Sequence, residues 1–348
     1  MKSGGQDQSR DSAGRITATQ VFAILNEERG SDAWRQSQTA ERPIRSESRV
    51  EAPEPRLIGI ISTTPDLPQT MHPFFGPVFA GIKACLVAAR CDVFVPSYNP
   101  APPLGSDPQT IERCHTHGAQ GLIVMGLDSA DPDFPLMLES GLPIMVVDCQ
   151  AIGERVGFVM SNGIDGMATA VRHLYKLGRR RIATITGLML TRPAIDRLLG
   201  YRSELDRLGL EQRPEYVVES DFTPASGYEQ MKRLLALPEP PDAVAAVSDL
   251  TAVGAIVAIE EIGLRVPEDI AVVGFGDSPF APVMRPALTT VHPNALEIGM
   301  AAADGILAML DRPGDPPPAI ILPVELVVRE SCGIELLQQD AYDERSAS

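Results

Sequence analysis

The chain has no run of about 18 apolar residues, so no membrane-spanning helix is indicated. Its first residues are polar and lack the apolar core of a secretory signal. Its cysteines form no CxxC pair, and all of them lie scattered within apolar stretches, at Cys85, Cys91, Cys114, Cys149 and Cys332. This distribution is typical of small buried residues in a reducing compartment. We therefore expect a cytoplasmic protein that makes no membrane contact.

The motifs of common catalytic and nucleotide-binding sites are also missing. There is no GxSxG, no P-loop and no HExxH. GFGDSPF (274–280) resembles half of a GxGxxG fingerprint, but its third glycine is absent and MRPALTT follows where a helix is needed. The histidines are scattered, and only His115 and His117 are close, at a spacing more typical of a solvated helix. We predict no enzymatic activity, no cofactor and no metal site.

The charge of the chain is strongly negative and unevenly distributed. The net charge is −16, yet residues 1–56 contain nine Lys/Arg and nine Asp/Glu and are neutral. The whole excess of acid therefore falls on residues 57–348. Because an acidic surface repels phosphate backbones, the charge gives no support to direct nucleic-acid binding.

Residues 1–55 differ from the rest of the chain. They are rich in Ser, Gln, Arg and Glu, which is typical of a solvated leader or linker. Within them, TATQVFAILNEERG (17–30) predicts one short helix that begins at Thr17 and ends at Gly30. One such helix cannot bury itself, so we expect it to pack on a partner or to fray. Residues 333–348 are expected to form a flexible tail.

From residue 56 onward, β-branched runs alternate with segments of helical periodicity. RLIGIIS (56–62), GLIVMG (121–126) and LPIMVVD (142–148) have the profile of buried parallel strands. Two such series predict an α/β protein with two doubly wound parallel-sheet lobes. The expected bounds are about 56–150 plus 280–310 for the first lobe, and about 155–278 plus the C-terminal strands for the second. A ligand should then bind beyond the carboxyl ends of the strands, in a cleft between the lobes.

Nine stretches, in order, resemble the sensor domain of the LacI/GalR regulators, a fold of the periplasmic-binding-protein-like I type. Together they cover about residues 56–332. They are IGIIS…HPFFGPVFAGI (58–82), GAQGLIVMG (118–126), LPIMVVD (142–148), SNGIDGMATAVRHLYKLGRRRIATITG (161–187), RLLGYRSEL (197–205), SDLTAVGAI (248–256), LRVPEDIAVVGFGD (264–277), PALTTV (286–291) and LPVELVVRES (322–331). The resemblance implies a homodimer, a small sugar-like effector and a hinge whose closure reports the ligand. It also implies three lobe-crossing segments, which we expect near 149–156, 276–288 and 311–320.

The resemblance assigns four ligand contacts in the first part of the site. Phe74 and Phe75 stand where an aromatic ring stacks on a sugar, although one of the two can simply be core. Asp148 ends a strand and can accept two hydroxyl hydrogen bonds, or it can cap or support a crossing. Arg197 aligns with the effector-binding arginine of the family, and its donors suit vicinal hydroxyls or a carboxylate.

Further candidates lie in the second series of strands. Phe222 occupies the place of an aromatic cleft wall, and Ser248 precedes Asp249, which either caps the next helix or touches the ligand. Ser161 and Asn162 are weaker candidates at the first strand end of the second lobe. Relatives usually carry Asp-Asn there, so Ser161 departs from the pattern.

The strand ending at Gly274-Phe275-Gly276-Asp277 should also deliver ligand contacts. Sugar sensors carry a carboxylate where Gly276 stands, and here Asp277 follows one position later. Pro293 likewise replaces a residue that is often polar. Because the site loses one anion and keeps Arg197, a sugar-acid effector becomes less unfavourable. The alternative is that the loss only reflects a smaller ligand.

LacI-type regulators begin with a helix-turn-helix and a hinge helix. Residues 1–55 show one possible helix and no second helix after a small-residue turn. We therefore expect a ligand-sensing regulator and keep open a sensor that acts without DNA, through a partner protein or a heterodimer. A solute-binding receptor is the third interpretation, but it needs an export signal.

Overall fold

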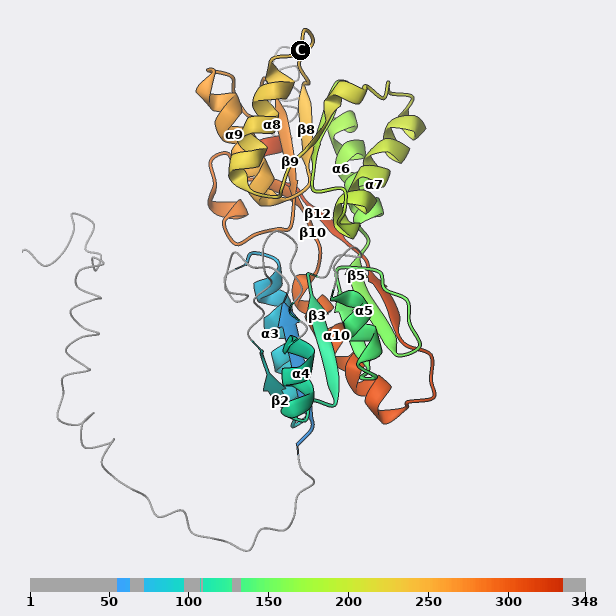
Figure 1. Cartoon of the computed structure of the whole chain (residues 1–348). Coiled ribbons are helices and arrows are strands. Elements are labelled where there is room, and N and C mark those ends of the chain that lie inside the picture. The colour runs from blue at the N-terminus through green and yellow to red at the C-terminus, as the bar shows by residue number, and fades with distance from the viewer. Residues whose placement is uncertain (1–54, 63–71, 97–106, 108, 127–132, 334–348) are drawn as a thin grey trace, which may run out of the picture. The chain divides into compact units, whose positions relative to one another are not determined.

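The computed structural model describes residues 55–62, 72–96, 107, 109–126 and 133–333. These residues build two six-stranded sheets with helices around them (Figure 1). The predicted leader helix and most of the leader, as well as nearly all of the tail, lie outside the described residues. Within the described residues, no helix is long and apolar enough to span a membrane.

The first sheet has the strand order β11-β5-β4-β3-β1-β2, and all of its strands are parallel. The strands and the helices that pack on them are β1 (Leu57–Ser62), α3 (Phe75–Ala88), β2 (Asp92–Phe94), α4 (Gln109–Thr116), β3 (Gly121–Met125), α5 (Phe134–Glu139), β4 (Ile144–Val147), β5 (Val156–Ser161), α10 (Ala295–Asp311) and β11 (Ala319–Leu322).

The second sheet has the order β12-β10-β9-β8-β6-β7, with only β12 antiparallel. Its elements are α6 (Gly163–Lys176), β6 (Ile182–Thr186), α7 (Arg192–Leu208), β7 (Val217–Glu219), α8 (Pro224–Leu235), β8 (Ala243–Ala246), α9 (Asp249–Glu261), β9 (Ala271–Phe275), β10 (Thr289–His292) and β12 (Glu325–Val327). Both sheets reverse their strand order in the same place, at β1 and β3 in the first and at β6 and β8 in the second. The predicted α/β class is confirmed.

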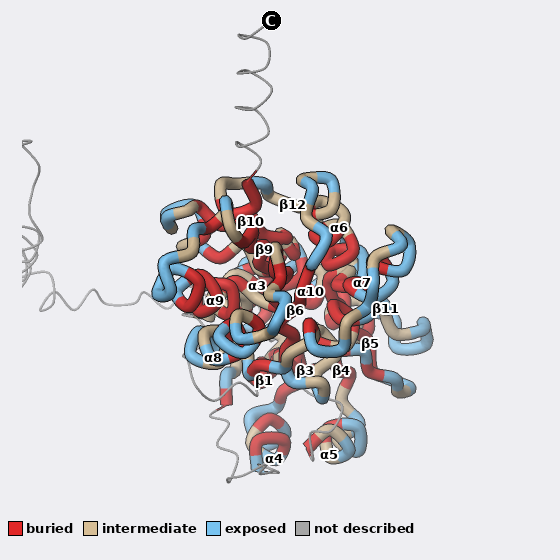
Figure 2. Tube along the Cα trace, turned by 90° about the horizontal axis from the view of Figure 1, so that it is seen from above, coloured by how far each residue is buried: buried red, intermediate tan, exposed pale blue. Residues whose placement is uncertain are grey.

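The strands are apolar throughout because both faces of each sheet are covered. In β3, Ile123 and Met125 join the cluster formed with α3 and α10, whereas Leu122 and Val124 join the cluster formed with α4 and α5. This alternation follows from the two-residue period of a strand. In the second sheet, α8 and α9 cover one face and α6 and α7 the other. Figure 2 shows buried residues gathered between helices whose outer sides are exposed.

Two glycines let the helices of the first sheet pack closely. A Cβ atom on Gly81 of α3 would overlap the backbone of α10 at Leu296, and one on Gly299 of α10 would overlap the backbone of α3 at Val78. The two helices therefore touch through their backbones. Any side chain at either position would force them apart.

The lobe bounds expected from the sequence differ from the observed sheets. The strand β5, expected in the second lobe, pairs with β4 in the first sheet, and β10 pairs with β9 in the second. The C-terminal strands are split, because β11 joins the first sheet and β12 the second. There are three crossings, as expected, but they lie at residues 162, 293–294 and 323–324. The expected segments near 149–156, 276–288 and 311–320 do not cross between the sheets. They lie between β4 and β5, between β9 and β10, and between α10 and β11, and each of these pairs belongs to one sheet or its covering helix.

A buried carboxylate joins α6 to α7. Glu204 of α7 receives two hydrogen bonds from Arg172 of α6, at 2.8 and 3.1 Å, and also pairs with Arg207. The hydrogen bond from Arg207 and then those from Arg172 lower the pKa of Glu204 to about 2, against the opposing effect of burial. A depressed folded-state pKa means that this group stabilises the fold above its ordinary pKa and that the stabilisation is lost as the pH falls toward 2.

We predict that Glu204→Gln lowers the free energy of unfolding by about 2 kcal/mol at pH 7, because a charged acceptor of two arginines is lost. The difference from the wild type should shrink as the pH falls below the ordinary glutamate pKa. Urea unfolding at a series of pH values measures it, with the exposed Glu229→Gln on α8 as control. Equal losses in the two variants would contradict the prediction.

Candidate functional site

The candidate residues of the second sheet lie at the carboxyl ends of its strands. Phe222 follows β7, Ser248 follows β8 and Asp277 follows β9. Gly187 follows β6, beside the place where the strand order reverses. In open α/β sheets, ligands bind outside the carboxyl ends of the strands at such a reversal.

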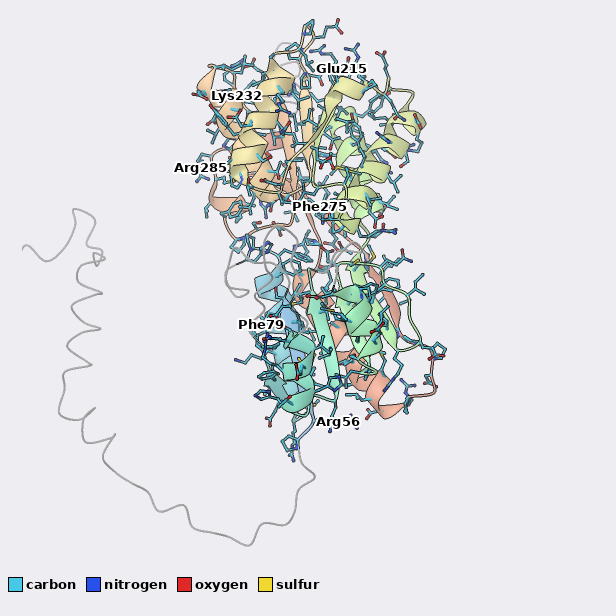
Figure 3. All side chains as sticks on the ribbon, in the orientation of Figure 1. Arg56, Phe79, Glu215, Lys232, Phe275 and Arg285 are labelled. Carbon is cyan, nitrogen blue, oxygen red and sulfur yellow. The ribbon has the colours of Figure 1, made fainter. Side chains whose placement is uncertain are left out.

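Arg197 is a buried cation at this edge. It lies on the buried face of α7, with 8% of its surface exposed. Its Nη1 donates to the carbonyl oxygen of Val247 at 2.8 Å, and its guanidinium carbon lies 3.8 Å from the centre of the Phe275 ring. Phe275 ends β9 and is labelled in Figure 3. The Nε of Arg197 is buried and has no hydrogen-bond partner within the described residues.

Three carboxylates surround this cation. Burial lowers the pKa of Arg197, while the charges of Asp148, Asp196 and Asp249 raise it. Asp196 forms an ion pair with Arg192 at 2.7 Å, and Asp249 is held by hydrogen bonds of its own. Asp148 alone of the three belongs to the part of the chain built around the first sheet.

Asp148 directly follows β4 in the left-handed region, with φ 63°. Its backbone N–H donates to the carbonyl oxygen of Val159 on β5. Burial raises the pKa of its carboxyl group to about 6, and the charge of Arg197 opposes this rise. Within the described residues, no direct ion pair joins Asp148 to Arg197. The two side chains therefore influence each other electrostatically without forming a direct ion pair.

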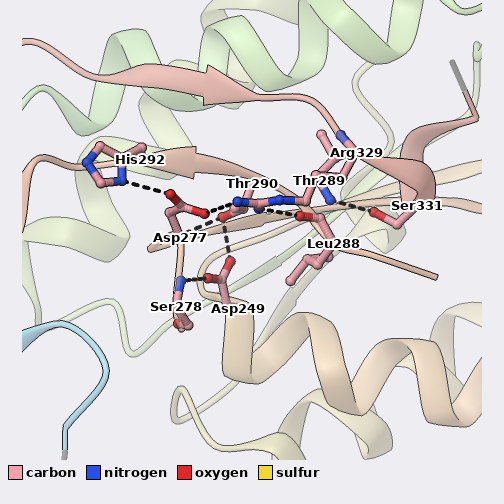
Figure 4. A network of polar contacts seen from close by, with 9 residues as sticks. All are labelled: Asp249, Asp277, Ser278, Leu288, Thr289, Thr290, His292, Arg329 and Ser331. Carbon is pink, nitrogen blue, oxygen red and sulfur yellow. Dashed lines mark hydrogen bonds and ion pairs between the residues drawn. The ribbon is translucent and has the colours of Figure 1, made fainter. Parts of the chain in front are cut away.

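The structure gives Asp249 neither the helix-capping role nor a shown ligand contact, the two roles that the sequence left open. Ser248 caps α9, since its hydroxyl accepts the Thr251 N–H at 3.2 Å. Asp249 is buried and accepts the Ser278 N–H at 2.6 Å and the Thr290 hydroxyl at 2.5 Å (Figure 4). Burial raises the pKa of Asp249, and these hydrogen bonds oppose the rise.

Asp277 supports the structure at the strand end, with both carboxylate oxygens engaged. One accepts a hydrogen bond from Arg329 at 2.6 Å, and the other lies 3.0 Å from His292 Nδ1 (Figure 4). We therefore do not retain Asp277 as a ligand contact. Gly276 has φ 137°, and a Cβ atom there would lie 3.3 Å from the Asp249 carboxylate. Both facts disfavour a carboxylate side chain at position 276.

Of the two neighbouring aromatic residues, Phe75 belongs to the core of the first sheet, at 7% exposure. Phe74 is half-buried beside it, with ring centres 5.0 Å apart. The backbone N–H groups of both donate to His72 Nδ1 at 3.2 Å. Phe74 is therefore the one of the two that we retain as a candidate.

Phe222 is half-buried and also has a left-handed backbone, with φ 68°. Such a conformation is costly for a bulky residue and is found mainly where the surroundings enforce it, often at functional sites. Three of the seven predicted site residues share this feature, namely Asp148, Phe222 and Asp277.

The two weaker candidates lie at a lobe crossing. Ser161 is buried at the end of β5, so it ends a strand of the first sheet and not of the second. Asn162 caps α6 by accepting the Asp165 N–H at 3.1 Å. Pro293 lies in the second crossing, between β10 and α10.

Sequence reasoning missed Phe275 and Arg329. The sequence placed Phe275 at a strand end near the site but did not predict that its ring lies under the Arg197 guanidinium. Arg329 comes after β12 and reaches Asp277 from a segment 52 residues away. The packing of α7 on the second sheet brings Phe275 to Arg197, and the pairing of β12 with β10 brings Arg329 to Asp277, so no local signal could have found these contacts.

Several known proteins resemble this chain. A family model described as a periplasmic binding protein-like domain matches residues 171–332. The HTH-type transcriptional repressor PurR of Pectobacterium carotovorum is 30% identical over 261 residues, which cover 74% of this chain and 73% of that protein. The chain belongs to the LacI/GalR family of regulators. The predicted resemblance is thereby confirmed, and a relative named as a transcriptional repressor accords with a non-enzymatic protein.

Two further LacI/GalR relatives are named with sugars. The ribose operon repressor of Haemophilus influenzae is 29% identical over 283 residues, which cover 80% of this chain and 81% of that protein. A solved complex of the regulator CelR with cellobiose is 27% identical, with a TM-score of 0.71 over 91% of this chain and 92% of that one.

We predict that Asp148 makes the stability of the protein fall between about pH 4 and pH 6. Because its folded-state pKa is raised from 3.8 to about 6, the folded state binds the proton more tightly, and raising the pH through this window removes that advantage. Asp148→Asn should abolish this part of the pH dependence. Urea unfolding at half-unit pH steps tests this, with the exposed Asp304→Asn on α10 as control. An unchanged slope in Asp148→Asn would refute it.

Proposed function

We propose that this LacI/GalR protein senses a small polyhydroxylated molecule held between Asp148 and Arg197. The observation that carries the proposal is the Arg197 guanidinium, which is buried, whose Nε has no hydrogen-bond partner among the described residues, and which feels the charge of Asp148 without an ion pair to it. A buried donor without a partner costs free energy, and a ligand hydroxyl would recover it. Phe74, Phe222 and Ser248 are the further residues that we assign to this site.

The local charges favour a neutral sugar. The charges of three carboxylates act on Arg197, and a ligand carboxylate would add a further anion to this group. The sugars named with the relatives CelR and the ribose operon repressor are cellobiose and ribose, both neutral. A sugar acid is the second candidate, because Gly276 places no carboxylate at the end of β9.

We further propose that the protein works as a homodimer in transcription regulation. The neutral charge of residues 1–56 favours the alternative in which the sensor acts through a partner protein or a heterodimer rather than by touching DNA. Sedimentation of the purified chain alone shows whether it forms a homodimer. Sedimentation with a labelled DNA fragment of its own upstream region shows whether it binds DNA directly.

The ligand proposal is tested by thermal shift against a panel of neutral sugars including ribose and cellobiose, the matching sugar acids, and nucleosides. A ligand that binds only the native state raises the Tm by mass action. We expect at least one neutral sugar to do so and its acid to be weaker. A panel without any shift would overturn the proposal, and a stronger shift with the acid would select the second candidate.

We predict that Arg197→Lys weakens the binding of the compound about 10- to 100-fold, because lysine keeps the charge but lacks the planar set of N–H donors of the guanidinium. Calorimetric titration measures the change in Kd. Arg202→Ala, on the exposed side of the same helix, is the matched control and should leave the Kd unchanged. If Arg197→Lys binds as tightly as the wild type, Arg197 is not a ligand contact.

A further inference from the structure

Phe222 and Gly187 lie in direct contact at the carboxyl edge of the second sheet. Gly187 is buried and directly follows β6. A Cβ atom built on it would overlap three carbon atoms of the Phe222 ring. The ring therefore lies where any other residue at position 187 would have its side chain.

The segment that carries Phe222 is tied to the same strand end. Ser220 donates both its backbone N–H and its hydroxyl to the carbonyl oxygen of Thr186, each at 2.8 Å. The Phe222 N–H in turn lies 3.4 Å from the Ser220 hydroxyl oxygen. The left-handed backbone of Phe222 is thus held by contacts on both sides, to β6 through Ser220 and to Gly187 through the ring.

The backbone at position 187 does not itself require glycine. Gly126 and Gly276, which follow β3 and β9, have φ values of 75° and 137°, which glycine adopts without strain and other residues rarely adopt. Gly187 is not among the residues with positive φ. Alanine is therefore compatible with its backbone, and within the described residues the atoms nearest to its Cβ position all belong to the Phe222 ring.

We propose that Gly187 is a positioning residue for Phe222 and sets how closely the aromatic wall of the ligand site approaches the sheet. This inference rests on the proposed function for its consequence in binding, since Phe222 is assigned there as a ligand contact. The place fits the role, because β6 borders β8, whose following residue Val247 accepts the hydrogen bond from Arg197. A side chain at 187 would move the ring and change which ligands fit beside Arg197.

The contact is tested first without any ligand. The chain contains ten phenylalanines, and labelling with 4-fluorophenylalanine gives one fluorine signal for each. The Phe222 signal is assigned by its loss in Phe222→Leu. In Gly187→Ala we expect this signal to shift more than the other nine, while Gly314→Ala, whose Cβ meets nothing within 4 Å, leaves all of them in place. An unmoved Phe222 signal in Gly187→Ala would overturn the proposal.

A double-mutant cycle then separates positioning from general damage. Gly187→Ala should lower the Tm by about 3 °C or more in the wild type and by less than about 1 °C in Phe222→Ala, where the ring is gone. For each panel compound that stabilises the wild type, Gly187→Ala should raise the Kd at least about tenfold. In the Phe222→Ala background, the same substitution should raise the Kd less than about twofold. Equal effects in both backgrounds would overturn the inference. If no compound of the panel bound, the proposed function would be overturned. The fluorine signal and the Tm cycle would still show whether Gly187 positions the Phe222 ring.

Discussion

The buried charge of Arg197 is the constraint on which the site depends. Removing a guanidinium from water is costly unless hydrogen bonds and opposite charges compensate it. The carbonyl oxygen of Val247 and the ring of Phe275 supply part of this compensation from the second sheet. Asp148 supplies another part from the end of a strand in the first sheet. In the function that we propose, a ligand held between these two charges would stabilise this arrangement over others. Such a difference in affinity between arrangements is what a sensor requires.

Three short crossings connect the two sheets. Each is only one or two residues long, and hydrogen bonds join them to one another. The N–H of Asn162 in the first crossing donates to the carbonyl oxygen of Leu322, where the third begins. Asn294 in the second donates its side-chain amide to Pro323 in the third, at 3.2 Å. Hinges of domain closure are typically a few residues at the ends of elements, and the three crossings have this position.

The polar groups at the end of β9 hold the site in place without contacting the ligand in our proposal. Asp249 fastens the start of α9 to Ser278 and Thr290, and Asp277 fastens the neighbouring loop to Arg329 and His292. A carboxylate with both oxygens engaged is a rigid support. In our proposal, the aromatic and charged groups nearer to β6 and β8 recognise the ligand. This division explains why an acidic residue after Gly276 does not replace the carboxylate that sugar sensors carry at that position.

The sequence by itself determined the two parallel sheets, because apolar runs and helical periods are local properties that both covered faces of a sheet impose on each strand. It also determined that Asp148 and Phe222 come after strands, whereas Arg197 was predicted from the family resemblance and lies within α7. Only the tertiary structure decided which sheet β5 and β10 join, since short crossings leave no mark in composition. It likewise decided that Phe75 faces the core, that Asp277 pairs with Arg329, and that Gly187 lies under the Phe222 ring. These outcomes depend on contacts between segments far apart in the chain, and no local pattern of residues encodes them.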